Sequence, residues 1–269
     1  MPEREIVEDQ ASVMVAIPHR STVPLLKAVL PLWRHQTVSP WIMVVDTGST
    51  EKELADLDVL VRQGSINTLI QIEQPDDAVH YCGRIAQACE MAQMYAFGKN
   101  IEFLFHTHSD VFPMRRDLLE MYLRICRSDE PVVGYHMSSR DDRSGALREL
   151  WRGMVGHTMT MCHCPTLKKH QILWSRKAAE ERFGIKTLLK DSWDTEVTFN
   201  KSLREAGIKP LFLGFDTNYE KMVDCNHVHC RSYPSQSLFF SESDYAKKSA
   251  QWVADEIQSA AAREWAWSH

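Results

Sequence analysis

Polar side chains that could bind an anion and a metal ion follow successive short apolar segments of the chain. Carboxylates and imidazoles are common metal ligands, and guanidinium groups bind phosphates. Together these groups suit a nucleotide diphosphate with a divalent metal. In chain order the candidates are Pro18, His19 and Arg20, then Asp46, then Gly83 and Arg84, and then His106, His108 and Asp110.

Each candidate also has an ordinary structural interpretation. Asp46 precedes Thr-Gly-Ser and could serve only to form a turn. Arg20 and Arg84 could be surface charges, and a single histidine such as His108 is more often structural. We favour a shared site because all of them fall at equivalent positions after strand-like segments.

The elements that would position these residues form an α/β pattern. Short apolar runs alternate with helical patterns, which predicts a mainly parallel sheet flanked by helices, with ligands bound at the carboxyl ends of its strands. Strands are expected at Ser12–Pro18, Trp41–Asp46, Asn67–Glu73, Ile101–His106, Val132–His136, Thr158–His163 and Pro210–Phe215. Helices are expected at Val23–Gln36, Glu51–Gln63, Gly83–Phe97, Arg115–Arg127, Asp194–Gly207 and Ser243–Trp267.

Three segments resemble the inverting, family 2 type of GT-A glycosyltransferases. Leu30–Asp56 contains Gln-Thr, a proline and then Ile-Met-Val-Val-Asp-Thr-Gly-Ser, similar to the opening of that family. His108-Ser109-Asp110 stands where the family has an Asp-x-Asp metal triplet. Asp194-Thr195-Glu196, followed by Leu203-Arg204-Glu205-Ala206-Gly207, resembles the family's acidic helix. The resemblance covers about residues 12 to 215 and implies a Rossmann-like GT-A fold.

The resemblance assigns a role to each matching residue. Asp46 would bind the base of a UDP- or GDP-type sugar donor, with Pro18, His19 and Arg20 lining the base and ribose pocket. Gly83 and Arg84 would lie near the diphosphate, and Asp110 would hold a divalent metal, Mn²⁺ before Mg²⁺. Asp194 would be the general base that deprotonates the acceptor hydroxyl.

This sequence departs from the family pattern at two places. His108 replaces the first acid of the triplet and either ligates the metal or leaves Asp110 to hold it alone. Trp193 replaces the acid expected before Asp194, so Glu196 is a rival for the general base.

Two groups of cysteines and histidines occur late in the chain. In the family a late histidine often returns to the metal or diphosphate, which points to His227 or His229. Cys162, Cys164, Cys225 and Cys230 could bind structural zinc, although Cys162 and Cys164 are more simply small core residues on one face of a strand.

The bulk composition fits a single globular domain. The chain has 269 residues, 44% of them hydrophobic, and a net charge of −5, which argues against a globally basic nucleic-acid-binding surface. We expect a nucleotide-binding half at about 12–115, an acceptor half at about 116–242 and a C-terminal helix at about 243–267. The start lacks the pattern of a signal peptide, no run is long enough to cross a membrane, and seven scattered cysteines suggest reduced thiols, so a cytoplasmic protein is expected.

The sequence leaves two other functions and the acceptor open. A nucleotidyltransferase of related fold would usually have a glycine-rich loop after the first strand, which this chain lacks. A non-catalytic, zinc-stabilised binding module would use the cysteine and histidine groups. Arg140, Arg143, Arg148 and Arg152 make one segment basic, so the hydroxyl acceptor could be a glycan or a modified nucleic acid, or the segment could be a solvated loop.

Overall fold

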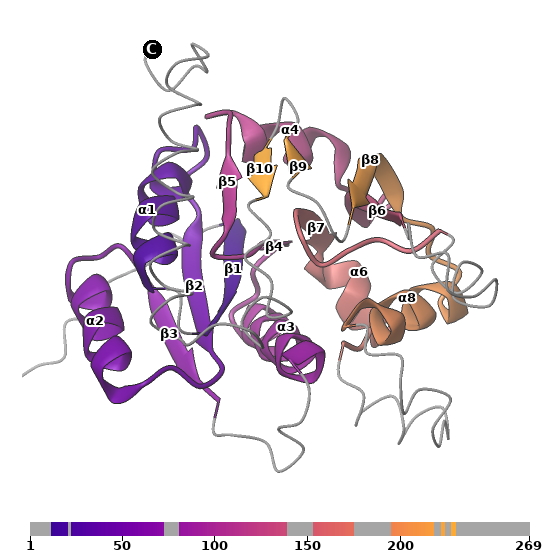
Figure 1. Ribbon diagram of the computed structural model, residues 1–269. Helices are drawn as coiled ribbons and strands as arrows, with labels where there is room; N and C mark the ends of the chain where they lie inside the picture. The colour runs from indigo at the N-terminus through magenta and orange to yellow at the C-terminus, as the bar shows by residue number, and fades with distance from the viewer. Residues whose placement is uncertain are drawn as a thin grey trace, which may run out of the picture.

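The molecule is built on a mainly parallel seven-stranded sheet with helices on both faces, as the sequence predicts (Figure 1). The computed structural model describes residues 12–20, 23–72, 81–138, 153–174, 195–217, 222–223 and 227–229. The strand order is β3-β2-β1-β4-β7-β6-β8, and β7 alone of these strands runs antiparallel to its neighbours. The strands are β1 (Val13–His19), β2 (Trp41–Asp46), β3 (Thr68–Gln71), β4 (Phe103–His106), β6 (Val132–Ser138), β7 (Thr160–His163) and β8 (Leu211–Thr217).

A second, three-stranded sheet lies next to the end of β4. It has the order β5-β10-β9, built from β5 (Val111–Pro113), β9 (Met222–Val223) and β10 (His227–His229). β10 is antiparallel to β5, with His229 opposite Val111 and His227 opposite Pro113. This pairing brings a late segment of the chain beside the residues that follow β4.

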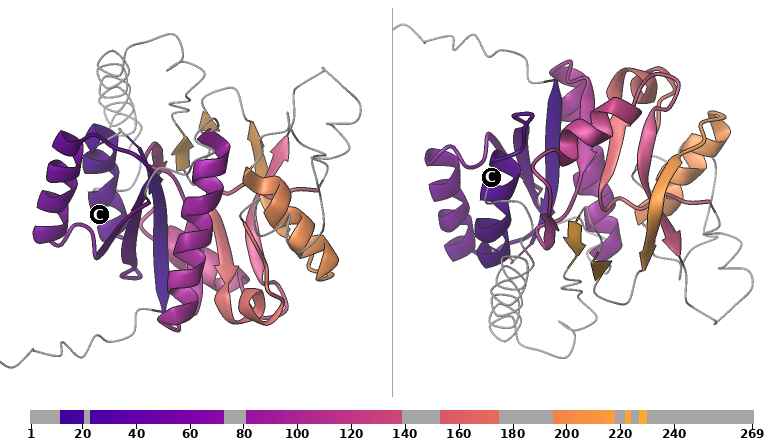
Figure 2. Two further views of the ribbon diagram at one scale, coloured as in Figure 1. Left: turned by 90° about the horizontal axis from the view of Figure 1, so that it is seen from below. Right: turned by 90° about the horizontal axis from the view of Figure 1, so that it is seen from above.

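The helices divide between the two faces of the large sheet (Figure 2). Alternate residues of β1 point to opposite faces, as the pleat requires, so Val15 packs in one cluster and Met14 in the other. The first cluster includes α1 (Val23–Arg34), α2 (Glu51–Arg62) and α4 (Leu118–Ile125). The second includes α3 (Tyr81–Gly98), α6 (Cys164–Lys169) and α8 (Thr195–Glu205).

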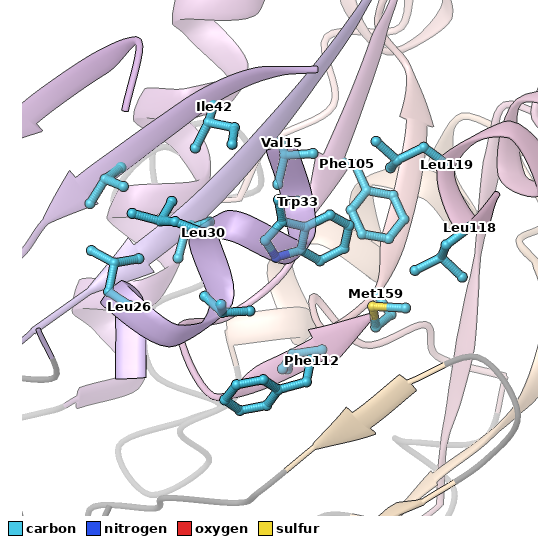
Figure 3. Packing of buried hydrophobic residues seen from close by; sticks show 14 of the residues in the cluster. Val15, Leu26, Leu30, Trp33, Ile42, Phe105, Phe112, Leu118, Leu119 and Met159 are labelled. Carbon is cyan, nitrogen blue, oxygen red and sulfur yellow. The ribbon is translucent and has the colours of Figure 1, made fainter. Parts of the chain in front are cut away.

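The first cluster includes the aromatic side chains of Trp33 and Phe105, which lie side by side in Figure 3, and that of Tyr122. The ring centroids of Trp33 on α1 and Phe105 on β4 are 5.4 Å apart, and Tyr122 on α4 meets Phe105 edge-on at 4.9 Å. Each such buried side chain contributes roughly 1.5–3 kcal/mol of burial free energy. This packing fixes the end of β4, from which the loop with His108 and Asp110 leaves the sheet.

Local sequence signals explain where helix α2 begins. Thr50 is its N-cap, and its hydroxyl accepts a hydrogen bond from the Glu53 backbone N–H while the Glu53 carboxylate accepts from Thr50 N–H. This capping box ends the loop after β2 and fixes its length.

The expected elements within the described ranges are present, with shifted ends and four omissions. The strand expected from Thr158 begins at Thr160 because Met159 has a positive φ of 57°, and the helix expected from Arg115 begins at Leu118. Elements β5, β9, β10 and α6 were not predicted. The expected helix at Ser243–Trp267 lies outside the described residues. No helix of the described part is long and apolar enough to cross a membrane.

Candidate active site

The carboxyl ends of β1, β2 and β4 meet at one edge of the sheet. His19 and Asp46 are register partners at the ends of β1 and β2. The Thr107 N–H, just after β4, donates to Ala16 O of β1 at 3.0 Å. The polar residues that follow β1, β2 and β4 therefore lie at one edge of the sheet. The fourth group, Gly83 and Arg84, lies at the start of α3.

Asp46 organises the loop that follows β2. Its Oδ2 accepts hydrogen bonds from the backbone N–H groups of Gly48 at 3.2 Å and Ser49 at 3.1 Å, and its Oδ1 accepts from Ser49 Oγ at 2.5 Å. The carboxylate is buried, with 3% of the residue exposed. The turn-forming interpretation of Asp46 is thus realised, and a donor-binding role would come in addition to it.

His19 is buried at the same place and is held in the neutral form. The backbone N–H and hydroxyl of Thr47 both donate to His19 O, at 2.9 and 3.1 Å. Burial lowers the pKa of the His19 imidazole to about 4, and the nearby Asp46 and Glu53 carboxylates only partly oppose this shift. Pro18 is half-buried beside it and Arg20 is exposed.

Arg84 places a buried guanidinium against the loop after β2. It lies in the first turns of α3, one residue after Gly83, and only 6% of it is exposed. Its Nη1 donates a long hydrogen bond to Thr47 O at 3.3 Å, while its Nε has no acceptor among the described residues. Burial and the positive charge of Arg20 lower the Arg84 pKa. Two neighbouring cations, one of which has an Nε donor without an acceptor among the described residues, suit an anionic ligand.

His108, Ser109 and Asp110, at the position of the family's metal triplet, are buried in the loop after β4. Asp110 is 6% exposed and His108 is 8% exposed. The Nδ1 of His108 lies 3.9 Å from Oδ1 of Asp110. His229 on β10 pairs with Val111, the residue that follows Asp110, so the backbone of β10 lies beside this loop. The side chains of His227 and His229 lie outside the described part.

A buried pair that the sequence reading did not identify lies beside this triplet. The carboxylate of Glu196, on α8, accepts hydrogen bonds from Nδ1 and from the backbone N–H of His157. The ring of His157 lies against the ring of His108, with centroids 4.2 Å apart and planes tilted by 40°. Glu196 therefore points into the site, but toward a histidine that precedes β7.

His106, the last residue of β4, is buried near His108 and His157. Its ring lies 4.8 Å from that of Trp174, and neither ring nitrogen has a partner among the described residues. Burial, with the neighbouring His157 and His108, lowers the pKa of His106 to about 3. Near neutral pH it is therefore a neutral imidazole.

The remaining expectations concern Asp194 and the cysteines. Asp194 lies immediately before α8 but outside the described residues, as do Cys225, Cys230 and the basic segment 140–152. Cys162 and Cys164 are buried free thiols in the second core cluster, and Cys164 begins α6 and does not share a strand with Cys162, because β7 ends at His163. Burial raises the pKa of both thiols, to about 12 for Cys164, which favours the core role over zinc binding.

The residues present fit one divalent cation held jointly with a ligand. No group of three or more His, Cys, Asp or Glu side chains within the described ranges is placed to hold a metal ion. Asp110 and His108 supply two donor groups. Mg²⁺-type sites often use one or two carboxylates plus substrate phosphates and water, so a complete protein cage is not required.

Comparisons with known proteins give only distant structural similarity. No family model and no characterised protein matches the sequence. The mannosyltransferase PcManGT from Pyrobaculum calidifontis, solved with GDP-Man and Mn²⁺, is 16% identical with a TM-score of 0.49, over 77% of this chain and 55% of that one. S. aureus TarS is 16% identical with a TM-score of 0.44, over 61% of this chain and 30% of that one. A cytidylyltransferase from Leptospira borgpetersenii is 11% identical with a TM-score of 0.47, over 93% of this chain and 96% of that one. Similarity at this level carries no argument about activity, which has to come from the residues themselves.

Proposed function

We propose that this protein is a metal-dependent glycosyltransferase of the GT-A type, which moves a sugar from a nucleotide-sugar donor to a hydroxyl acceptor. One observation carries the proposal. Where the carboxyl ends of β1, β2 and β4 meet, the buried guanidinium of Arg84 lies near Arg20, and the buried Asp110 follows β4. A nucleotide diphosphate with a divalent cation complements both kinds of charge.

The donor would be bound by residues of the first half of the sheet. Arg84 and Arg20 bind the diphosphate by charge-assisted hydrogen bonds. Neutral His19, with Pro18 and the loop organised by Asp46, lines the pocket for base and ribose. We expect a UDP- or GDP-type donor.

Asp110, with His108 beside it, would hold the cation. When bound, the cation neutralises the negative charge that develops on the departing nucleotide diphosphate. An imidazole beside the carboxylate favours Mn²⁺ over the harder Mg²⁺.

The acceptor hydroxyl needs a proton acceptor, and we assign that role to Asp194. Glu196 is the rival acid, but its carboxylate is buried and already accepts from His157, which leaves it poorly placed to receive a further proton. Direct displacement by the deprotonated hydroxyl would invert the anomeric centre of the sugar.

Ligand-dependent stabilisation tests the proposal. Thermal unfolding is measured with UDP, GDP, CDP, TDP and ADP, each with and without Mn²⁺. A ligand at about 100 times its Kd adds about 2.7 kcal/mol, which raises Tm by about 5–10 °C for a domain of this size. Asp110→Asn should abolish the Mn²⁺-dependent part of the shift. Asp56→Asn, which removes an exposed carboxylate on α2 that pairs with Lys27, is the matched control.

The same preparation then shows whether transfer occurs. Incubation with the matching nucleotide sugar and candidate acceptors should release the nucleotide diphosphate, and proton NMR of the product gives the anomeric configuration. Absence of any nucleotide-dependent shift, with and without Mn²⁺, contradicts the proposed function.

A further inference from the structure

The Glu196–His157 pair joins two elements that are distant in sequence at a single buried point. Glu196 is 3% exposed and His157 is 5% exposed. The carboxylate accepts from both the ring Nδ1 and the backbone N–H of the same histidine, at 3.2 Å for the latter. A ring held by its own Nδ1 and by its backbone cannot rotate freely, so its orientation is fixed.

The α8 side of the pair is itself anchored. Asn200, one turn after Glu196, exchanges hydrogen bonds with the backbone of Val155, at 2.9 Å to its Oδ1 and 2.8 Å from its Nδ2. The segment that carries His157 is therefore tied to α8 at two places, Val155 and His157. Both attachments hold the histidine at a set distance from the helix.

The fixed ring is in contact with the triplet position. His157 and His108 have ring centroids 4.2 Å apart, and His108 Nδ1 is 3.9 Å from Asp110 Oδ1. Two atoms that each bind one cation at about 2.0–2.2 Å can be at most about 4.4 Å apart. The His108 and Asp110 donors satisfy that limit.

From this geometry we propose that His157, held by Glu196, is a positioning residue that fixes His108 as the second protein ligand of the cation at Asp110. The inference rests on the proposed function, because it assumes the cation. It adds which residues set the ring of His108, and it gives Glu196 a role other than general base. Contacts outside the direct ligands commonly control the orientation of a ligating histidine and the affinity for the metal.

The cost of burying this pair supports a role beyond packing. Replacing a buried acid–base pair by apolar residues of similar volume is often neutral or stabilising. The neighbouring contact between Trp174 and Phe199, stacked at 3.8 Å, shows that the same helix also packs with purely apolar groups. A polar pair at this position therefore suggests a function for its orientation.

The experiment measures Mn²⁺ affinity directly by electron paramagnetic resonance of free Mn²⁺, with and without UDP. The main variant combines His157→Phe with Glu196→Gln, which removes the ring hydrogen bond without leaving a buried, unpaired carboxylate. Glu196→Gln alone is the conservative variant. Phe199→Leu on the same helix is the control, because Phe199 is an apolar core residue whose ring stacks on Trp174.

We expect the double variant to raise the Mn²⁺ Kd by about 10- to 100-fold, and Glu196→Gln alone to raise it by about tenfold. Phe199→Leu should lower Tm and leave the Mn²⁺ Kd unchanged. If the variants fold and their Mn²⁺ Kd stays within twofold of that of the unmodified protein, the positioning role is overturned. The proposed function is not affected by that result. If the double variant does not fold, Glu196→Gln decides by the same criterion. If the unmodified protein shows no Mn²⁺ binding that Asp110→Asn removes, the proposed function fails together with this inference.

Discussion

Replacing Arg84 by methionine should separate stability from donor binding. Methionine keeps an unbranched chain of similar length that can pack in the first turns of α3, and it removes the guanidinium. Arg84 is 6% exposed, its Nε has no acceptor among the described residues, and Arg20 lies near enough to lower its pKa. Such a buried cation is unfavourable until an anion binds to it.

The expected size of each effect follows from these contacts. Arg84→Met loses one long hydrogen bond to Thr47 O, at 3.3 Å, which contributes about 1.5 kcal/mol, the lower end for a hydrogen bond that involves a charged group. Removal of the buried charge offsets that loss, so the free energy of unfolding without ligand should be unchanged or higher. A hydrogen bond to a charged group contributes about 1.5–3 kcal/mol, so the Kd for the nucleotide diphosphate should rise about 10- to 150-fold.

Calorimetric titration with UDP or GDP in the presence of Mn²⁺, together with urea unfolding, measures both quantities. The control is Arg124→Met on α4, an exposed arginine paired with Glu120, which should change neither quantity by more than a few tenths of a kcal/mol. The reasoning is refuted if Arg84→Met destabilises the free protein by several kcal/mol while the nucleotide Kd is unchanged. That result would make the guanidinium a structural group.

Two further predictions concern His19, at the end of β1, and Gly134, on β6 in the other half of the sheet. Burial lowers the folded-state pKa of His19 to about 4, below the usual value of about 6.5, so its contribution to stability is complete above pH 6.5 and is lost as pH falls toward 4. The free energy of unfolding, measured with urea, should therefore fall less between pH 7 and pH 5 in His19→Gln than in the unmodified protein. Equal decreases in the two proteins would count against the buried, neutral imidazole. Gly134→Ala would place a Cβ 2.3 Å from Thr160 Oγ1 and 2.6 Å from Val155 Cγ2, which should cost about 1–3 kcal/mol in a thermal unfolding experiment. Gly98→Ala, whose Cβ would meet nothing within 4 Å, is its control, and an equal Tm for the two variants would contradict the close approach.

The parts of the fold that could be predicted are those set by local sequence. β1 and β2 are nearly continuous apolar runs, as strands buried on both faces should be. Helix α2 begins at Glu51, as expected from the sequence, and Thr50 is its N-cap. These signals lie within a few residues of the feature that they determine, so no tertiary information is needed.

The missed strands depend on partners that are distant in sequence. β5 is only Val111–Pro113, and β10 is only His227–His229. Neither has a period long enough to indicate a strand, and each forms because it pairs with the other. A signal for α6 was present, because Pro165 suits the first turn of a helix and Lys168 and Lys169 suit the last.

The site shows the same division between local and distant information. Candidates that follow strand ends, such as Asp46 and Asp110, could be selected because position in the strand pattern predicts position in the sheet. His157 precedes a strand and has no motif of its own. Its importance depends on Glu196, 39 positions away in sequence, and on contact with the ring of His108. An isolated histidine before a strand was the signal available, and it is too common to be selected without the structure.

The two sides of the site differ in charge, and this difference explains why the proposed reaction needs a metal. On the β1, β2 and α3 side, the positive charges of Arg84 and Arg20, which lie near each other, would attract a diphosphate directly. On the β4 side, the carboxylate of Asp110 would repel the same diphosphate, and the nearby His106 is neutral. In the proposed reaction a divalent cation at Asp110 would reverse that repulsion, because it would bind the carboxylate and the phosphates together. The arginines alone would give a site for nucleotides, whereas the carboxylate of Asp110 would make donor binding depend on the cation.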